Sequence, residues 1–417
     1  RAFEKRLYVA LTQDQIDWSP APGEWSIGEV LDHVIQAAAI GGRMIATALK
    51  RGEAQRCRGG QRGKKRVRLA WPGSGGLWYR GQGARRRSTV TTMRAMVTTG
   101  PGDYDVMRLE EVPVPSPGPR EVLVRNHASG VCYHDHLIRV GVMKRGIRFP
   151  LILGHEGAGV VEAVGEAVRS LKPGDRVACT QWTEACGLCR FCRTNREQLF
   201  KIQEDSLLPL PPEVGFEEGA ILSCAIGTVV AAIRDVGRVQ AGEYVLVTGA
   251  GGGLGVHAIQ VARLCGATVI GQTTSPGKVD VIREAGAHEV VVARDGRFAD
   301  EVRRLAGGEG VDLVCDNVGA PVFEEALRAT ARGARYVLVG ELTGDQVTFN
   351  TARLFLKGVS LLSTTSTSRT QLASVIDLVR RRLLRPMITE RFALGEAPRV
   401  HRLMVERKLS GRVLLIP

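Results

Sequence analysis

The chain has 417 residues, 44% of them hydrophobic and 24% charged, which is ordinary for a folded protein and excludes wholesale disorder. This length is enough for two or three domains. No window of about 18 apolar residues lacks a charge, so the sequence predicts no membrane span. Nine cysteines, an odd number in a long chain, favour thiols and metal ligands over a disulfide framework. We therefore expect a protein of the reducing cytoplasm.

Most of the net charge of +14 comes from one segment. Residues 55–92 contain eleven Lys or Arg and no acid, whereas the rest of the chain has 46 basic against 43 acidic side chains. Such a basic run could contact nucleic acid or an anionic surface. Its Gly and Arg bias and its lack of apolar periodicity favour an unfolded linker or the translated junction of a damaged gene model. We expect no nucleic-acid partner.

Residues 1–54 are predicted to be helical. Apolar side chains recur at helical spacing after Ser26, a candidate N-cap with Glu29 three residues further on. The run that ends at His33 resembles the opening of a DinB-like four-helix bundle, in which a histidine at this position is a metal ligand. The next histidine is His127, so the other ligands of such a site are missing. We interpret His33 as an ordinary helix residue.

From residue 93 the pattern changes to α/β. Short strands between Pro and Gly turns run through 112–124, 157–164 and 174–178, as in a β-barrel-like domain. Further along, strands and helices alternate, which predicts a doubly wound parallel sheet. The six apolar strands of this sheet are expected at Tyr244–Val247, Thr268–Ile270, Glu289–Val292, Asp312–Cys315, Tyr336–Val339 and Val359–Leu362.

A glycine-rich loop joins the first of these strands to a predicted helix over 256–264. Its glycines allow a tight turn and let the backbone approach a pyrophosphate, which the N–H groups of the helix N-terminus bind. The glycines that fit the motif best are Gly249, Gly252 and Gly255, so the motif here is one residue longer than G-x-G-x-x-G. Because the loop follows a strand and opens a helix, we predict a dinucleotide site at Gly249, Gly252, Gly253, Leu254 and Gly255.

The end of the second strand bears on the choice of dinucleotide. An NAD-specific site places Asp or Glu near Thr273, where it accepts hydrogen bonds from the ribose. No acid lies between Ala267 and Val279. Thr273, Ser275 and Lys278 could accommodate a 2′-phosphate, so we expect NADP in preference to NAD. An ordinary exposed helix residue is the alternative interpretation of Lys278.

Several motifs after residue 93 resemble those of the zinc-dependent medium-chain alcohol dehydrogenases. They are Gly130–Asp135 (GVCYHD), Gly154–Gly157 (GHEG), Ser223–Thr228 (SCAIGT), Val314–Gly319, Val337–Glu341 and Ser410–Val413. The resemblance implies a GroES-like catalytic domain at 93–228, a Rossmann NAD(P)-binding domain at 229–365, and a return to the catalytic domain at 366–417. It also implies a homodimer or homotetramer, and it places at the cofactor Thr228, Val318, Val339, Gly340 and Arg412.

By this resemblance Cys132, His155 and Cys224 would hold a catalytic Zn²⁺, with Glu156 beside them as a further candidate. Asp135 would accept a hydrogen bond from His155 and fix its ring. The residue types agree, because two thiolates and an imidazole leave a fourth position for water or an alcohol oxygen. Taken singly, either cysteine would more often be a buried core thiol.

Two departures from the family stand out. The family carries Ser or Thr two residues after its first zinc cysteine, where a proton relay begins, whereas this chain has His134, which could still pass protons. The second departure concerns the structural zinc site of the family, of which this chain has three cysteines, with Phe200 in place of the fourth. A closed structural site needs four ligands. We therefore expect at most one tightly bound zinc, and only a degenerate site at Cys186, Cys189 and Cys192.

The leading hypothesis is zinc-dependent, NAD(P)-linked interconversion of an alcohol with an aldehyde or ketone. The motif around Cys132 also occurs in enoyl- and acryloyl-thioester reductases, so an NADPH-dependent reductase of such a thioester or of a quinone is the alternative. An inactive cofactor-binding homologue is a third hypothesis, which Phe200 and the short segment before Leu207 favour. The expected partner is a small-molecule substrate. The sequence does not name it, because pocket residues are scattered along the chain.

Overall fold

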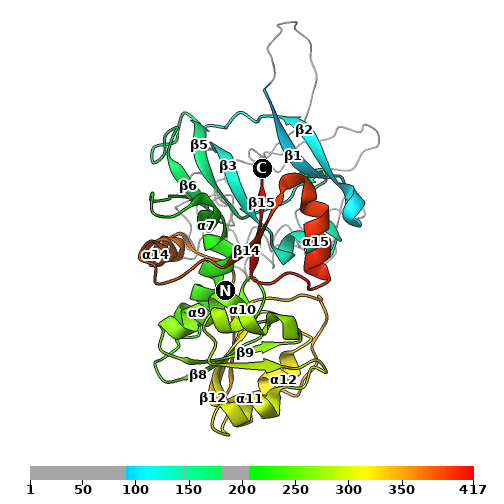
Figure 1. Ribbon diagram of the computed structural model, residues 1–417, viewed down its shortest axis with the longest axis vertical. Coiled ribbons are helices and arrows are strands. Elements are labelled where there is room, and N and C mark those ends of the chain that lie inside the picture. Colours follow the sequence, from blue (N-terminus) through cyan, green and yellow to red (C-terminus); the bar gives the residue numbers. More distant parts are fainter. Residues whose placement is uncertain (1–90, 145–146, 181–205) are drawn as a thin grey trace, which may run out of the picture. The chain divides into compact units, whose positions relative to one another are not determined.

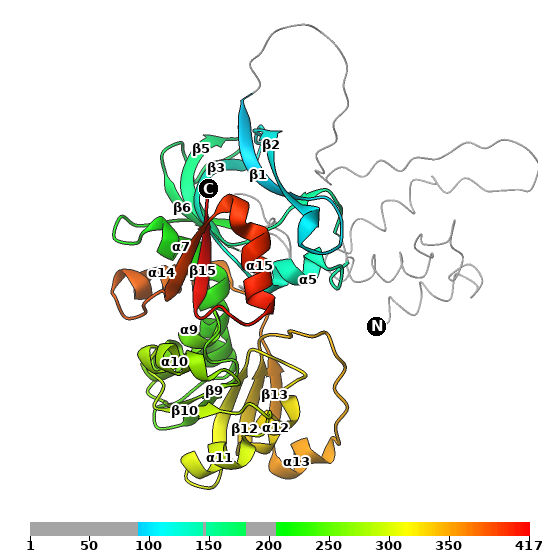
Figure 2. The ribbon, with the colours of Figure 1, turned by 45° about the vertical axis from the view of Figure 1, so that its right-hand side comes forward.

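The computed structural model describes residues 91–144, 147–180 and 206–417 (Figures 1 and 2). The segment 1–54 that is predicted to be helical, nearly all of the basic segment 55–92, and the three cysteines of the predicted degenerate zinc site with Phe200 lie outside these residues. The predictions made for them stay predictions.

Two sheets form the barrel-like domain. A three-stranded sheet has the order β2-β1-β4, and a six-stranded sheet has the order β14-β15-β3-β5-β6-β7. The strands are β1 (Thr92–Thr98), β2 (Met107–Pro113), β3 (Val122–Gly130), β4 (Leu151–Ile152), β5 (Gly157–Val164), β6 (Arg176–Cys179), β7 (Leu207–Pro209), β14 (Ile388–Ala393) and β15 (Arg412–Ile416).

The short strands expected within 112–124 are the end of β2 and the start of β3, with a proline-rich stretch between them. β2 ends at Pro113 and β3 begins only at Val122. The residues between them include Pro115, Pro117 and Pro119. Proline has no N–H to donate to a neighbouring strand, so this stretch cannot continue a ladder.

The second sheet is doubly wound and parallel throughout, as predicted. Its order is β10-β9-β8-β11-β12-β13, and every pair of neighbours is parallel. The order reverses direction at β8, which places a crevice at the carboxyl ends of β8 and β11. The strands are β8 (Tyr244–Val247), β9 (Thr268–Thr273), β10 (Glu289–Val292), β11 (Val311–Asp316), β12 (Thr330–Leu338) and β13 (Ser360–Ser363).

Helices cover both faces of this sheet because its strands are apolar on both sides. One face packs against α9 (Gly255–Leu264) and α10 (Val279–Glu284), and the other against α11 (Ala299–Leu305) and α12 (Phe323–Arg328). Figure 2 shows α13 (Ala352–Lys357) beside α12 at the β12–β13 end.

A helical run over Phe216–Val236 crosses the expected domain boundary at 228. It consists of α7 (Phe216–Ile221), the π-helical segment η4 (Leu222–Gly227), α8 (Thr228–Val230) and a second π-helical segment, η5 (Ala231–Val236). Within the described residues it alone is long and apolar enough to cross a membrane, but 83% of its apolar window is buried inside the protein. It is accounted for as a core helix.

The chain ends by returning to the barrel-like domain. After α14 (Arg369–Arg380), β14 and α15 (Ala397–Val405), the last strand β15 inserts between β14 and β3. Leu414 and Leu415 of β15 pair with Gly130 and Ser129 of β3. In Figure 1 the red strand β15 and the red helix α15 lie beside β3 and β1. The return therefore brings Arg412 close to the end of β3.

Candidate active site

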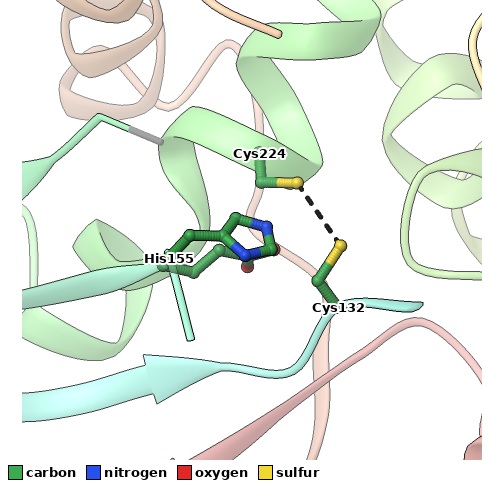
Figure 3. Close-up of side chains that lie close together, drawn as sticks. Cys132, His155 and Cys224 are labelled. Carbon is green, nitrogen blue, oxygen red and sulfur yellow. Dashed lines mark hydrogen bonds and ion pairs between the residues drawn. The ribbon is translucent and has the colours of Figure 1, made fainter. Parts of the chain in front are cut away.

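Three separate elements bring the candidate metal ligands together (Figure 3). Cys132 follows β3 and is the N-cap of α5 (Tyr133–Arg139), His155 lies in the loop between β4 and β5, and Cys224 lies in η4. The ligand atoms of these three residues and of Glu156 all lie within 4.8 Å of one another. These four residues form the donor cluster.

The spacing of the donor cluster fits a zinc ion. The sulfurs of Cys132 and Cys224 are 3.7 Å apart. Tetrahedral zinc with Zn–S bonds of about 2.3 Å separates two sulfurs by roughly 3.8 Å. With one imidazole, the two sulfurs make the soft Cys₂His set typical of catalytic zinc sites that keep a fourth position open. The residues present therefore fit the metal that the family resemblance implies.

Asp135 forms hydrogen bonds with two of these ligand residues. Its side chain is 3% exposed, and its Oδ1 lies 3.1 Å from Nδ1 of His155. Its Oδ2 accepts a hydrogen bond of 3.3 Å from the backbone N–H of Cys132. A proton on Nδ1 leaves Nε2 of His155 as the ligand atom, so one carboxylate sets the tautomer of the histidine and the start of α5.

Charges within the donor cluster shift its pKa values. Burial alone would lower the pKa of His155, but the negative charges of Asp135 and Cys132 raise it to about 10. The pKa of the Cys132 thiol lies well below its usual range, because its hydrogen bond with Cys224 and the charge of His155 outweigh the effect of burial. Without metal the pair is therefore a thiolate and an imidazolium.

Glu156 is held by an ion pair from the returning strand. Its side chain is buried, and its Oε2 lies 3.1 Å from Nε of Arg412, whose guanidinium also contacts Oε1. A Cβ on Gly130 would lie 2.1 Å from Oε2 of Glu156, so only glycine leaves room there. The other oxygen of Glu156 is 3.8 Å from Nε2 of His155. Arg412 thus links the donor cluster to the cofactor pocket, which it also lines.

His134 lies next to the donor cluster. The ring centroids of His134 and His155 are 5.2 Å apart. Burial lowers the pKa of His134, and the charge of His155 lowers it further. His134 is therefore neutral at neutral pH and can accept a proton. His136 instead lies 3.1 Å from the guanidinium of Arg139, on the side of α5 away from this contact.

A cavity of about 350 Å³ extends from Cys132 along the carboxyl ends of the parallel strands. The glycine loop forms one wall, and its orientation is fixed by the end of β11. There Oδ1 of Asp316 accepts hydrogen bonds from Thr248 Oγ1 at 2.6 Å and from the N–H of Val318 at 3.0 Å. Ten of the predicted cofactor residues line this cavity: Gly249, Gly252, Gly253, Leu254, Gly255, Thr273, Ser275, Lys278, Val318 and Arg412.

Three predicted cofactor residues, Thr228, Val339 and Gly340, are not among the residues that line this cavity, and their placement at the cofactor stays a prediction. Thr228 is buried in the core helix, and Val339 lies beyond the end of β12. Gly340 packs against the neighbouring loop, where a Cβ would lie 2.6 Å from the carbonyl oxygen of Asn317. The close approach of these two backbones leaves room only for glycine at position 340.

Lys278 is half-buried at the cavity edge and is not the exposed helix residue of the alternative interpretation. Its Nζ donates a hydrogen bond of 2.5 Å to the carbonyl of Leu409. Burial lowers its pKa, and the nearby guanidinium of Arg407 lowers it further. Arg407 also lines the cavity. Sequence reasoning missed Arg407, because no local pattern places the returning segment beside β9.

The returning segment is also bonded to the glycine loop. Nδ1 of His257 lies 2.7 Å from the carbonyl oxygen of Gly253, and its Nε2 accepts a hydrogen bond of 2.9 Å from the N–H of Met387. The N–H of Gly411 donates to the carbonyl of Gly251 at 3.0 Å. The returning segment therefore bonds the loop directly at Gly251, and bonds Gly253 through His257 of α9. Sequence reasoning missed His257, whose position in a helix pattern carries no such signal.

This combination of a barrel-like domain and a doubly wound dinucleotide domain defines an oxidoreductase that uses NAD(P) and acts on a small molecule. Residues 253–381 match the family model of zinc-binding dehydrogenases, and residues 118–221 match that of the alcohol dehydrogenase GroES-like domain. An acryloyl-coenzyme A reductase of Sulfurisphaera tokodaii is 31% identical over 344 residues, covering 78% of this chain and 100% of the relative. A quinone oxidoreductase of Rattus norvegicus is 30% identical over 333 residues, covering 78% and 98%. The chain belongs to the medium-chain dehydrogenase family.

Solved structures agree. The crystal structure of AibC matches with a TM-score of 0.72 at 36% identity, covering 81% of this chain and 99% of that one. An NAD-dependent alcohol dehydrogenase matches with a TM-score of 0.72 at 34% identity, covering 78% and 100%. The quinone oxidoreductase of Escherichia coli complexed with NADPH matches with a TM-score of 0.69 at 26% identity, again covering 78% and 100%. Relatives of this chain thus include both dehydrogenases and reductases.

Proposed function

We propose that this protein is a zinc-dependent, NADP-linked oxidoreductase that interconverts an alcohol with an aldehyde or ketone. One observation carries the proposal. The donor cluster opens onto the dinucleotide cavity, because Cys132 belongs to both. A substrate oxygen at the cluster would therefore have its carbon beside the cofactor.

Within this proposal, Cys132, His155 and Cys224 hold the metal and Asp135 orients the imidazole. When bound, zinc polarises the substrate oxygen and the nicotinamide exchanges a hydride with the adjacent carbon. His134, which is neutral and next to the donor cluster, accepts the proton that the hydroxyl loses and returns it in the opposite direction. His134 thus takes the proton-accepting role that Ser or Thr has at this position in the family.

The preference for NADP rests on charge at the cavity edge. Lys278 and Arg407 both line the cavity, and Arg407 is close enough to lower the pKa of Lys278. Thr273, also in the lining, occupies the place of the acid that an NAD-specific site requires. Two cations and no acid favour a 2′-phosphate over free ribose hydroxyls.

Reduction of an α,β-unsaturated thioester or a quinone by NADPH is the second candidate function. It is favoured by the full-length matches to an acryloyl-coenzyme A reductase and a quinone oxidoreductase. It is also favoured by His134 in place of the hydroxyl that serves alcohol oxidation in the family.

Zinc content and NADPH consumption test the proposal on the purified full chain. We expect one zinc at the donor cluster and NADPH consumption with small aldehydes or ketones. Cys132→Ala, His155→Ala and Cys224→Ala should each lose zinc and turnover but keep NADPH binding. Cys265→Ala, a half-buried thiol at the end of α9, is the matched control.

Three results would overturn the proposal in whole or in part. If Cys132→Ala reduced a carbonyl at the parent rate without metal, the zinc mechanism would be refuted. If the parent consumed NADPH only with acryloyl or enoyl thioesters or with quinones, the second candidate would replace the first. A protein that binds NADPH but oxidises it with none of these substrates would be the inactive homologue.

A further inference from the structure

One polar side chain in the cofactor cavity has no partner. Gln272, in β9, is 1% exposed and lines the cavity, yet its Nε2 makes no hydrogen bond within the described part of the chain. The residues level with it across the sheet, Thr248 and Asp316, bond to each other at 2.6 Å. The amide of Gln272 is thus the unsatisfied member of a polar row at the carboxyl ends of β9, β8 and β11.

Such a group is costly to keep in a fold. A buried amide that has exchanged water for no partner destabilises the native state, and most buried polar atoms in proteins are bonded. Leucine has nearly the same volume without this cost. An unpartnered amide that lines a binding cavity is therefore explained best by a ligand that completes its hydrogen bonds.

Other residues that line the same cavity indicate which kind of ligand Gln272 could bind. The same cavity is lined by Gly296, which follows β10, and by Val318, Pro321 and Val322, which follow β11. These residues offer apolar surface and, at Gly296, no side chain at all. A flat heteroaromatic ring suits such walls, and only its edge then needs polar contacts.

We propose that Gln272 recognises the adenine base of the dinucleotide. Adenine presents an amine donor beside the ring acceptor N7, and a carboxamide bonds both at once, with Oε1 accepting from the amine and Nε2 donating to N7. Thr273, the next residue, occupies the ribose position, which places the base beside the end of β9. This inference rests on the proposed use of NADP or NAD and adds a determinant of base specificity.

A hypoxanthine analogue of the cofactor tests the assignment, because its carbonyl replaces the adenine amine and turns that position from a donor into an acceptor. Dissociation constants of NADPH and of nicotinamide hypoxanthine dinucleotide phosphate, both reduced, are measured by fluorescence titration of the full chain. We expect the parent to bind the adenine form about 10-fold more tightly, as one bidentate amide–adenine pair allows. In Gln272→Leu the two constants should become equal through weaker binding of the adenine form.

Two further variants keep the test decisive. Gln272→Glu retains the acceptor for the amine but loses the donor to N7, so it should bind NADPH more weakly and still prefer adenine. Gln240→Leu changes an exposed glutamine that bonds the backbone of Arg238, and should behave as the parent. If Gln272→Leu fails to fold, the Glu variant carries the test. We expect the Leu variant to unfold at or above the parent temperature without ligand, since it removes an unsatisfied amide.

The proposal is overturned if the parent binds both dinucleotides equally, or if Gln272→Leu keeps the parent preference. These results leave dinucleotide binding intact and count against Gln272 alone. A parent protein that binds neither dinucleotide would refute both this inference and the proposed function.

Discussion

Removing the Asp135 carboxylate should weaken zinc binding in graded steps. Asp135 contacts two ligand residues, through Nδ1 of His155 at 3.1 Å and the N–H of Cys132 at 3.3 Å. Asp135→Asn keeps one oxygen acceptor but loses the charge and the second acceptor, so we expect zinc affinity to fall about 10-fold. Asp135→Ala removes both hydrogen bonds, and we expect a loss of about 100-fold, or roughly 2.8 kcal/mol at 1.4 kcal/mol per tenfold.

The affinity is measured by competition with a chelator of known zinc affinity on the purified full chain. Asp280→Asn, an exposed carboxylate on α10, is the control and should hold zinc as the parent does. Equal zinc affinity in Asp135→Ala and the parent would show that the carboxylate does not orient the imidazole. A weakening that is the same for both Asp135 variants would assign the effect to the charge and the second acceptor, which both variants lack.

The other predictions concern the cofactor and the pH. Lys278→Ala and Arg407→Ala should each weaken NADPH binding about 10-fold and leave NADH binding unchanged, because only NADPH carries the 2′-phosphate; tighter NADH binding by the parent in fluorescence titration would contradict this. Gly255→Ala should weaken both dinucleotides at least about 10-fold but keep zinc, because its Cβ would lie 2.4 Å from a backbone oxygen of the loop. Without metal, the free energy of unfolding of the parent, relative to that of a His155→Gln/Cys132→Ser variant, should be largest between about pH 6.5 and 9. In this window the folded pair holds one proton, on the imidazole, and the unfolded chain also holds one, on the thiol. Below this window the unfolded chain binds a second proton. Above it the unfolded chain loses its only proton, while the folded imidazole keeps its own to about pH 10, so stability falls on both sides. Urea titrations in which stability changes steadily with pH inside the window would contradict the pairing.

Patterns that are local in the chain were sufficient to predict the dinucleotide domain. Each parallel strand is a short apolar run, and the loop at Gly249–Gly255 combines a strand end, a tight turn and a helix start within a few residues. The doubly wound sheet is therefore confirmed. The break between β2 and β3 also follows from the sequence, because Pro115, Pro117 and Pro119 have no N–H to donate to a neighbouring strand.

The partners of the site residues depend on contacts that no local pattern encodes. Arg412 meets Glu156, which lies 256 positions earlier, only because β15 inserts beside β3. Arg407 reaches the cavity through the same return. Gln272 carries no signal in its own segment, since a glutamine in a strand becomes informative only when its burial and lack of partner are known.

The position of β15 also governs the order in which the protein can be assembled during synthesis. Its six-stranded sheet needs a strand from the far end of the chain between β14 and β3, so the barrel-like domain cannot close until the whole dinucleotide domain has left the ribosome. The dinucleotide sheet, by contrast, is built from one uninterrupted stretch and can form first. Until then β3 offers an open edge to other chains. A premature stop before Arg412 would leave that edge permanently uncovered. It would also remove the cation that neutralises Glu156. Even a very short C-terminal loss should therefore yield aggregated protein rather than a shortened enzyme.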